Sequence, residues 1–203
     1  MRTTLAALTL ATTALTVAAA PAAAPMPWDI DASHTTVGFS VKHFFTPVQG
    51  QFDDFEIDLQ YDEVDPSRST VSARIAVASV NTNNDRRDAH LMSADFFEAE
   101  AHPTITFEST SVRDAGDGNL VATGDLTIKG ITREVELPIT LLGIQEIPSE
   151  MQEMLGGAKK VASFGAELAI DRGDFDVGTG SWAATLVVGG DVNIDLAVEA
   201  HLR

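Results

Sequence analysis

Hydrophobic and polar residues alternate with a period of two over most of the chain after residue 28. Such alternation is typical of strands that bury one face of a sheet and expose the other. A glycine inside one of these segments, Gly124, indicates a bend or a bulge. The pattern predicts eight strands, over residues 37–42, 55–61, 71–77, 104–108, 120–128, 134–141, 161–170 and 192–198.

Turn-forming sequences separate these strands, among them residues 65–67, 114–119, 129–130 and 189–190. Most connections are short, and short connections join antiparallel neighbours. Antiparallel strands with one apolar face form either a sandwich or a closed barrel, and closure removes exposed sheet edges. We therefore expect an all-β fold, an eight-stranded antiparallel barrel of the size that can hold one small ligand.

Two longer connections have room for short helices, over residues 87–97 and 148–156. In the first, Asp88 is a candidate cap for a helix starting at Ala89, and Arg87 has acidic residues nearby to pair with. The alternative is that Arg87 and His90 face the polar head group of a ligand, because loops carry a large share of functional residues.

The pattern at the N-terminus is typical of a targeting segment and not of the folded domain. Arg2 precedes an uncharged apolar run over residues 5–20, and Ala-x-Ala patterns end near Ala20 and Ala24. This order is that of a secretory signal peptide. We expect residues 1–24 to be cleaved and residues 25–203 to form one exported domain, periplasmic or secreted.

Charge and cysteine content exclude several functions. The chain has 30 acidic residues against 13 Lys and Arg, a formal charge of −17, and it has no cysteine. Such a surface repels phosphate backbones, so no nucleic-acid partner is expected. Without cysteine, disulfides, thiolate nucleophiles and iron–sulfur clusters are excluded.

Catalytic and metal motifs are weak. His43, His90 and His102 flank the first long connection, but their spacing matches no zinc motif, so no metal or other cofactor is expected. No nucleophile elbow or phosphate-binding loop is present. An enzyme acting on a lipid or small substrate, with His43 or His90 as the acid–base group, remains the alternative to a binding protein.

Two Phe pairs, Phe44-Phe45 and Phe96-Phe97, fall in predicted connections. Adjacent side chains in such positions cannot both enter one face of a sheet. They suit the apolar rim of a cavity, or a lid across its mouth.

An ordered set of short motifs resembles the YceI-like family of exported lipid- or polyisoprenoid-binding proteins over residues 28–203. It includes residues 28–31 with His34, 37–43, 87–97, 102–109, 124–132 and 171–175. Two positions depart from the family pattern. Phe44-Phe45 replaces a small or glycine-containing turn, and Asp176 replaces a glycine.

The resemblance implies a lipocalin-like eight-stranded barrel with a long apolar cavity; the two longer connections add one or two short helices. The expected function is a carrier, not an enzyme, for a polyisoprenoid, a quinone tail or a similar amphiphile, and a homodimer is compatible with it. Together with the alternation, it predicts a cavity lined by Phe39, Val41, Ile75, Val77, Phe107, Leu126 and Ile128. At the cavity mouth it predicts His43, Arg87, His90, Phe96 and Phe97.

Overall fold

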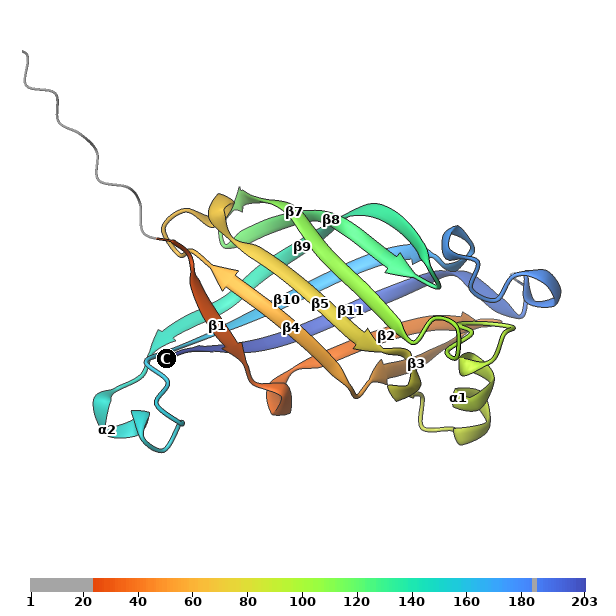
Figure 1. Cartoon of the computed structure of the whole chain (residues 1–203), viewed down its shortest axis with the longest axis horizontal. Helices are drawn as coiled ribbons and strands as arrows, with labels where there is room; N and C mark the ends of the chain where they lie inside the picture. The colour runs from red at the N-terminus through yellow and green to blue at the C-terminus, as the bar shows by residue number, and fades with distance from the viewer. Residues whose placement is uncertain (1–23, 184–185) are drawn as a thin grey trace, which may run out of the picture.

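One antiparallel sheet surrounds the apolar interior in the computed structural model, which describes residues 24–183 and 186–203 (Figure 1). The strands are β1 (Met26–Ile30), β2 (Thr36–His43), β3 (Thr46–Phe52), β4 (Phe55–Tyr61), β5 (Thr70–Ala76), β6 (Val80–Asn81), β7 (Thr104–Gly116), β8 (Asn119–Ile128), β9 (Ile131–Glu146), β10 (Lys160–Asp171) and β11 (Val188–Leu202). Their order is β1-β4-β5-β7-β8-β9-β10-β11-β2-β3-β6, and β11 also pairs with β1. That last pairing closes the barrel.

These segments make eight strand positions, because three of the positions are interrupted. β1 and β2 both pair with β11, at Ile30–Ala200 and Val37–Leu196, and a short turn separates them. β3 pairs with β2 and β4 pairs with β1, so β3 and β4 share the second position. β6 pairs with β3 and β5 pairs with β4, so β5 and β6 share the third. The predicted eight-stranded antiparallel barrel is therefore confirmed.

Gly124 produces the expected irregularity, although the register shift lies on the partner strand. The pairing of β7 with β8 shifts between Ser109 and Ser111, next to the Ser109–Gly124 pair. A Cβ atom at Gly124 would lie 2.5 Å from the main-chain oxygen of Glu108 and 2.7 Å from the Phe107 ring. Only glycine permits this close approach of the two strands.

The two helices lie at opposite ends of the barrel (Figure 1). α1 (Asp85–Met92) is in the first long connection, and α2 (Ser149–Gln152) joins β9 to β10. The expected cap at Asp88 is wrong: the helix begins earlier, because the Asn84 side chain accepts a hydrogen bond from the main-chain N–H of Arg87 at 3.1 Å. Asp88 lies inside α1.

The signal-peptide prediction falls on residues 1–24, and all but the last of these lie outside the described residues. Within residues 24–183 and 186–203, no helix combines the length and apolar character needed to cross a bilayer.

Candidate ligand-binding cavity

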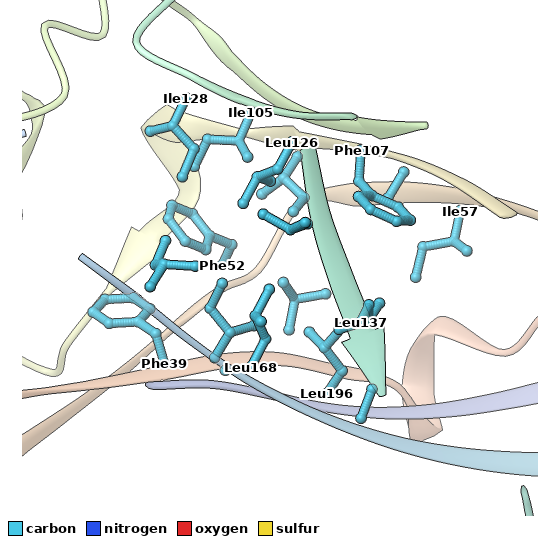
Figure 2. A pocket seen from close by; sticks show the side chains of 18 of the residues that line it. Phe39, Phe52, Ile57, Ile105, Phe107, Leu126, Ile128, Leu137, Leu168 and Leu196 are labelled. Carbon is cyan, nitrogen blue, oxygen red and sulfur yellow. The ribbon is translucent and has the colours of Figure 1, made fainter. Parts of the chain in front are cut away.

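The inward-facing side chains leave a cavity of about 260 Å³ inside the barrel. Its lining comes from all eight strand positions and from the connection that carries α1. Figure 2 shows Phe39, Phe52 and Leu196 among the labelled side chains that surround this space. Such an apolar cavity gives water few hydrogen-bond partners and therefore favours an apolar occupant. The described lining residues with polar or charged side chains are Tyr61, Ser69, Thr70 and Arg172.

Eight of the twelve residues predicted as site residues line the cavity: Phe39, Val41, Ile75, Phe96, Phe97, Phe107, Leu126 and Ile128. The other four, Val77, His43, Arg87 and His90, are not among its lining residues. Val77 is buried, but it follows β5 in a short 3₁₀ turn, where its main-chain N–H bonds to the carbonyl of Pro103 at 2.9 Å. The break in the strand takes Val77 out of the alternation that predicted its position.

Phe96 and Phe97 both reach the cavity from the connection after α1. The Phe97 ring lies 6.0 Å from that of Phe52, with an edge-on geometry. Phe96 is buried and packs beside the rings of His90 and Trp182, at centroid distances of 5.0 and 5.8 Å. The α1 connection thus supplies aromatic side chains to the interior of the barrel.

Arg87 holds the start of this connection instead of facing the cavity. It donates from Nε to the Thr82 hydroxyl and from Nη2 to the Thr82 carbonyl, each at 2.7 Å. Thr82 in turn bonds to the Asp88 carboxylate through its main-chain N–H and its hydroxyl. The expected direct pairing of Arg87 with a carboxylate is replaced by this bridge through Thr82.

The histidines that flank the connection occupy separate places. His90 lies 3.0 Å from the Asp95 carboxylate, and its ring also packs edge-on against Trp182 at 5.1 Å. His43 ends β2 and packs against Phe44. His102 lies beside Gly130 in the β8–β9 turn. No group of potential metal ligands found in the described residues contains any of these three.

Arg172 is a buried charge at the cavity wall. Its side chain donates five hydrogen bonds, all to main-chain carbonyls of the β10–β11 connection and the first residues of β11: Val177, Gly178, Trp182, Val188 and Gly189. Burial lowers the pKa of Arg172 below its ordinary value, and Asp171 opposes that shift. The guanidinium group therefore fixes the loop that covers this end of the barrel.

Tyr61, at the end of β4, was not predicted as a site residue. It is 6% exposed, lines the cavity, and packs edge-on against Phe164 at 5.3 Å. Within the described residues its hydroxyl forms no hydrogen bond. Burial raises its pKa, and the nearby carboxylates of Glu63, Asp114 and Asp62 add to that effect. The Tyr61 ring thus contributes to the lining, whose surface is almost entirely apolar.

The model of the YceI-like domain matches residues 28–200 of this chain. The chain belongs to the YceI-like family. Protein YceI of Escherichia coli O17:K52:H18 is 39% identical over 152 residues, which cover 74% of this chain and 75% of that protein. The crystal structure of BcnA from Burkholderia cenocepacia has a TM-score of 0.75 at 27% identity, over 85% of this chain and 99% of that one.

Another solved structure with a similar fold is a polyisoprenoid binding domain from Saccharophagus degradans. It has a TM-score of 0.62 at 12% identity and covers 88% of this chain and 99% of that one. At this identity the likeness shows a shared barrel fold. The family membership inferred from the ordered motifs is confirmed.

Both departures from the YceI-like pattern adopt backbone conformations that favour glycine. Phe44 and Asp176 each have φ of 53°, in the left-handed region. Asp176 ends the 3₁₀ turn that carries Arg172, and its carbonyl accepts a hydrogen bond from Lys129 at 3.1 Å. The fold thus keeps the glycine-type turns while this chain places larger side chains on them.

A group of metal-type side chains that the sequence analysis did not single out lies between β1, β2 and β11. Asp31, His34 and Glu199 place ligand atoms within 4.8 Å of one another. His34 Nδ1 lies 2.9 Å from Asp31 and 3.8 Å from Glu199, and Glu199 also contacts His201 at 3.1 Å. The direct His34–Asp31 hydrogen bond explains this arrangement without an ion.

Proposed function

We propose that this protein is an exported carrier that holds a long apolar chain, such as a polyisoprenoid, a quinone tail or a similar amphiphile, in its barrel cavity. The observation that carries the proposal is the lining: apolar side chains from every strand position surround one space. The fold shared with a domain named for polyisoprenoid binding supports the same class of ligand. Export, to the periplasm or beyond, is proposed from the signal-like residues 1–24.

The proposed contacts of the apolar chain are the eight predicted residues that line the cavity, together with Leu137, Leu168 and Leu196. They come from strands on different sides of the barrel, so a bound chain would be enclosed rather than held in a surface groove. Enclosure removes both ligand and cavity wall from water, at about 25 cal/mol for each Å² of apolar surface.

The proposed head group is neutral and forms a hydrogen bond with Tyr61. The phenol is buried among apolar rings, while the carboxylates of Asp62, Glu63 and Asp114 act on it. A carboxylate or phosphate head would meet their like charge at this end. An alcohol, amide or quinone carbonyl can bond to the phenol without that repulsion.

The test is native mass spectrometry of the protein recovered from the cells that export it, followed by organic extraction and identification of the bound mass. Ala166 faces the cavity from β10, and Ala169 lies exposed on the same strand. We expect a lipid mass on the wild-type protein and on Ala169→Phe, and its loss from Ala166→Phe, which fills the cavity. A wild-type protein that carries no lipid and takes up none when long-chain alcohols are added would refute the proposal.

A further inference from the structure

Three exposed apolar side chains gather at the end of the barrel that carries α1. Phe44 and Phe45 form the turn between β2 and β3, and Leu186 lies in the connection before β11. They are 50%, 91% and 75% exposed. The Phe44 N–H donates to the carbonyl of Val187 at 2.8 Å, which ties the two segments together. We call these three residues the apolar tip; Figure 1 shows its two segments at the α1 end.

The turn holds Phe44 in an unfavourable backbone conformation. Its φ of 53° lies in the left-handed region, which glycine and asparagine enter easily and residues with larger side chains avoid. Two-residue hairpin turns select Gly, Asn or Asp for this reason. A Phe that is strained here and half exposed is explained neither by turn chemistry nor by burial in the core.

The charge distribution sets the apolar tip apart from the rest of the molecule. The chain has a formal charge of −17, yet no Asp or Glu occurs between Asp31 and Asp53, and residues 177–190 contain no charged residue at all. Lys42 is the lone Lys or Arg between Asp31 and Asp53, and it packs beside Gly189. The two segments that carry the apolar tip are thus free of the charges that anionic lipid would repel.

The apolar tip is continuous with the cavity. Val188 pairs with His43 at the base of the hairpin, and Val188 also lines the cavity. Val41, two residues before His43, lines it as well. An apolar path therefore leads from the exposed aromatic side chains to the interior through residues of the same two strands.

We infer that the apolar tip inserts into the surface of a phospholipid bilayer, with Lys42 among the phosphate groups, so that the α1 end of the cavity faces the membrane. This inference rests on the proposed function, because an acyl or prenyl chain could then pass between bilayer and cavity without crossing water. Exposed aromatic side chains beside a basic residue are typical of interfacial binding.

The experiment is co-sedimentation of the purified protein with vesicles of phosphatidylcholine, and with vesicles of phosphatidylethanolamine and phosphatidylglycerol in a three-to-one ratio. We expect Phe45→Ser to reduce the partition coefficient about tenfold, because one exposed aromatic side chain leaves the membrane. Phe44→Gly should reduce it as well, while making the fold no less stable, since glycine removes the strain at φ of 53°. Val64→Ser is the matched control: Val64 is 95% exposed, in the connection after β4 at the other end of the barrel.

A second readout separates this inference from the proposed function. Binding of a dispersed fluorescent long-chain alcohol in the absence of vesicles should be the same for wild type and Phe45→Ser. If the wild type binds this alcohol but not the vesicles, or if Val64→Ser lowers vesicle binding as much as Phe45→Ser, the membrane inference fails and the carrier proposal stands. A dimer that Phe45→Ser dissociates, measured by sedimentation equilibrium without vesicle binding, would assign the apolar tip to a second copy of the chain.

Discussion

Arg172 lies beneath the connection between β10 and β11, and all five of its guanidinium N–H groups reach main-chain carbonyls there. A lysine at this position has three N–H donors on a single nitrogen and lacks the planar fork. At least two of the carbonyls would then lose their partner. Each buried polar group left without one costs about 1–3 kcal/mol.

We therefore expect Arg172→Lys to lower the free energy of unfolding by about 2–4 kcal/mol, measured by urea denaturation. Arg113→Lys is the control, because Arg113 is exposed and lies 3.6 Å from Glu136 on the outside of the barrel. Exposed pairs contribute less than about 1 kcal/mol. Equal small effects of the two substitutions would show that the hydrogen bonds from Arg172 to the five carbonyls do not stabilise the fold.

A substitution at Tyr61 tests whether the head group of the ligand bonds to its hydroxyl. Tyr61→Phe removes the hydroxyl and keeps the ring that packs on Phe164. A neutral hydrogen bond contributes about 0.5–1.5 kcal/mol, so we expect the affinity for a long-chain alcohol to fall about two- to tenfold. The affinity for the alkane of equal length should stay unchanged, as measured by competition with a fluorescent ligand. An unchanged alcohol-to-alkane ratio would mean that the head group lies elsewhere.

At the residue scale, the sequence predicted apolar positions better than polar ones. Phe107, Leu126 and Ile128 line the cavity because strict alternation fixes which face a strand residue occupies. Arg172 and Tyr61 were missed because their environments are made by tertiary contacts. Nothing in the local sequence shows that five carbonyls converge on Arg172. The alternation over residues 55–61 places Tyr61 on the inward face, but it does not show which side chains surround the ring.

Among the elements, the 3₁₀ turn over Ala32–His34 is where the first strand position is interrupted and the barrel closes against β11. His34 bonds to Asp31 at this turn and lies 3.8 Å from Glu199 of β11, which in turn contacts His201. The hydrogen bond from His34 lowers the pKa of Asp31 from 3.8, and the hydrogen bond to Asp31 raises the pKa of His34 from 6.5. The closure therefore contains a pair whose stability depends on pH.

The direction of that dependence follows from linkage. The contribution of Asp31 is present above its unfolded-state pKa and is lost as the pH falls through its lowered folded-state value. The contribution of His34 is present below pH 6.5 and is lost as the pH rises through its raised folded-state value. We expect the stability difference between wild type and His34→Asn to be larger at pH 5.5 than at pH 8.5, measured by urea denaturation.

Asp31→Asn is the reciprocal variant for this pair. Because it removes the carboxylate that raises the pKa of His34, it should reduce the same difference between the two pH values. The pair is exposed, so the effect should also shrink in high salt. A difference that persists in Asp31→Asn would place its origin in Glu199 and His201.

Sequence alternation identified a segment of each of the eight strand positions, but it predicted β7, β9 and β11 at about half their length or less, and its failures have local causes. β1 and β3 were missed: β1 has five residues, and β3 contains Pro47, Gly50 and two glutamines instead of a clear apolar face. The start of α1 was placed too late because Asn84, an equally good cap, precedes Asp88 by four residues. The sequence does not show that two short strands occupy one position of the barrel. For β1 and β2 this is visible only because both pair with β11.

For the whole molecule, a cavity lined by apolar side chains links stability to ligand content. A ligand that binds only the folded state stabilises it by about 2.7 kcal/mol at a free concentration of one hundred times its Kd. For a domain of this size, each kcal/mol shifts Tm by about 2–4 °C. If the cavity holds a lipid as proposed, the loaded protein and the protein stripped of lipid should unfold at different temperatures.

We expect extraction of bound lipid to lower Tm by about 5–10 °C, measured by differential scanning calorimetry, and a long-chain alcohol to restore it. Ala166→Phe fills the cavity, so it should show neither the loss nor the recovery. Ala169→Phe adds the same side chain on an exposed position of β10 and should behave like the wild type. An equal Tm for stripped and loaded wild type would mean that the bound molecule lies outside the cavity, because enclosure within the folded barrel is what makes binding specific to the folded state.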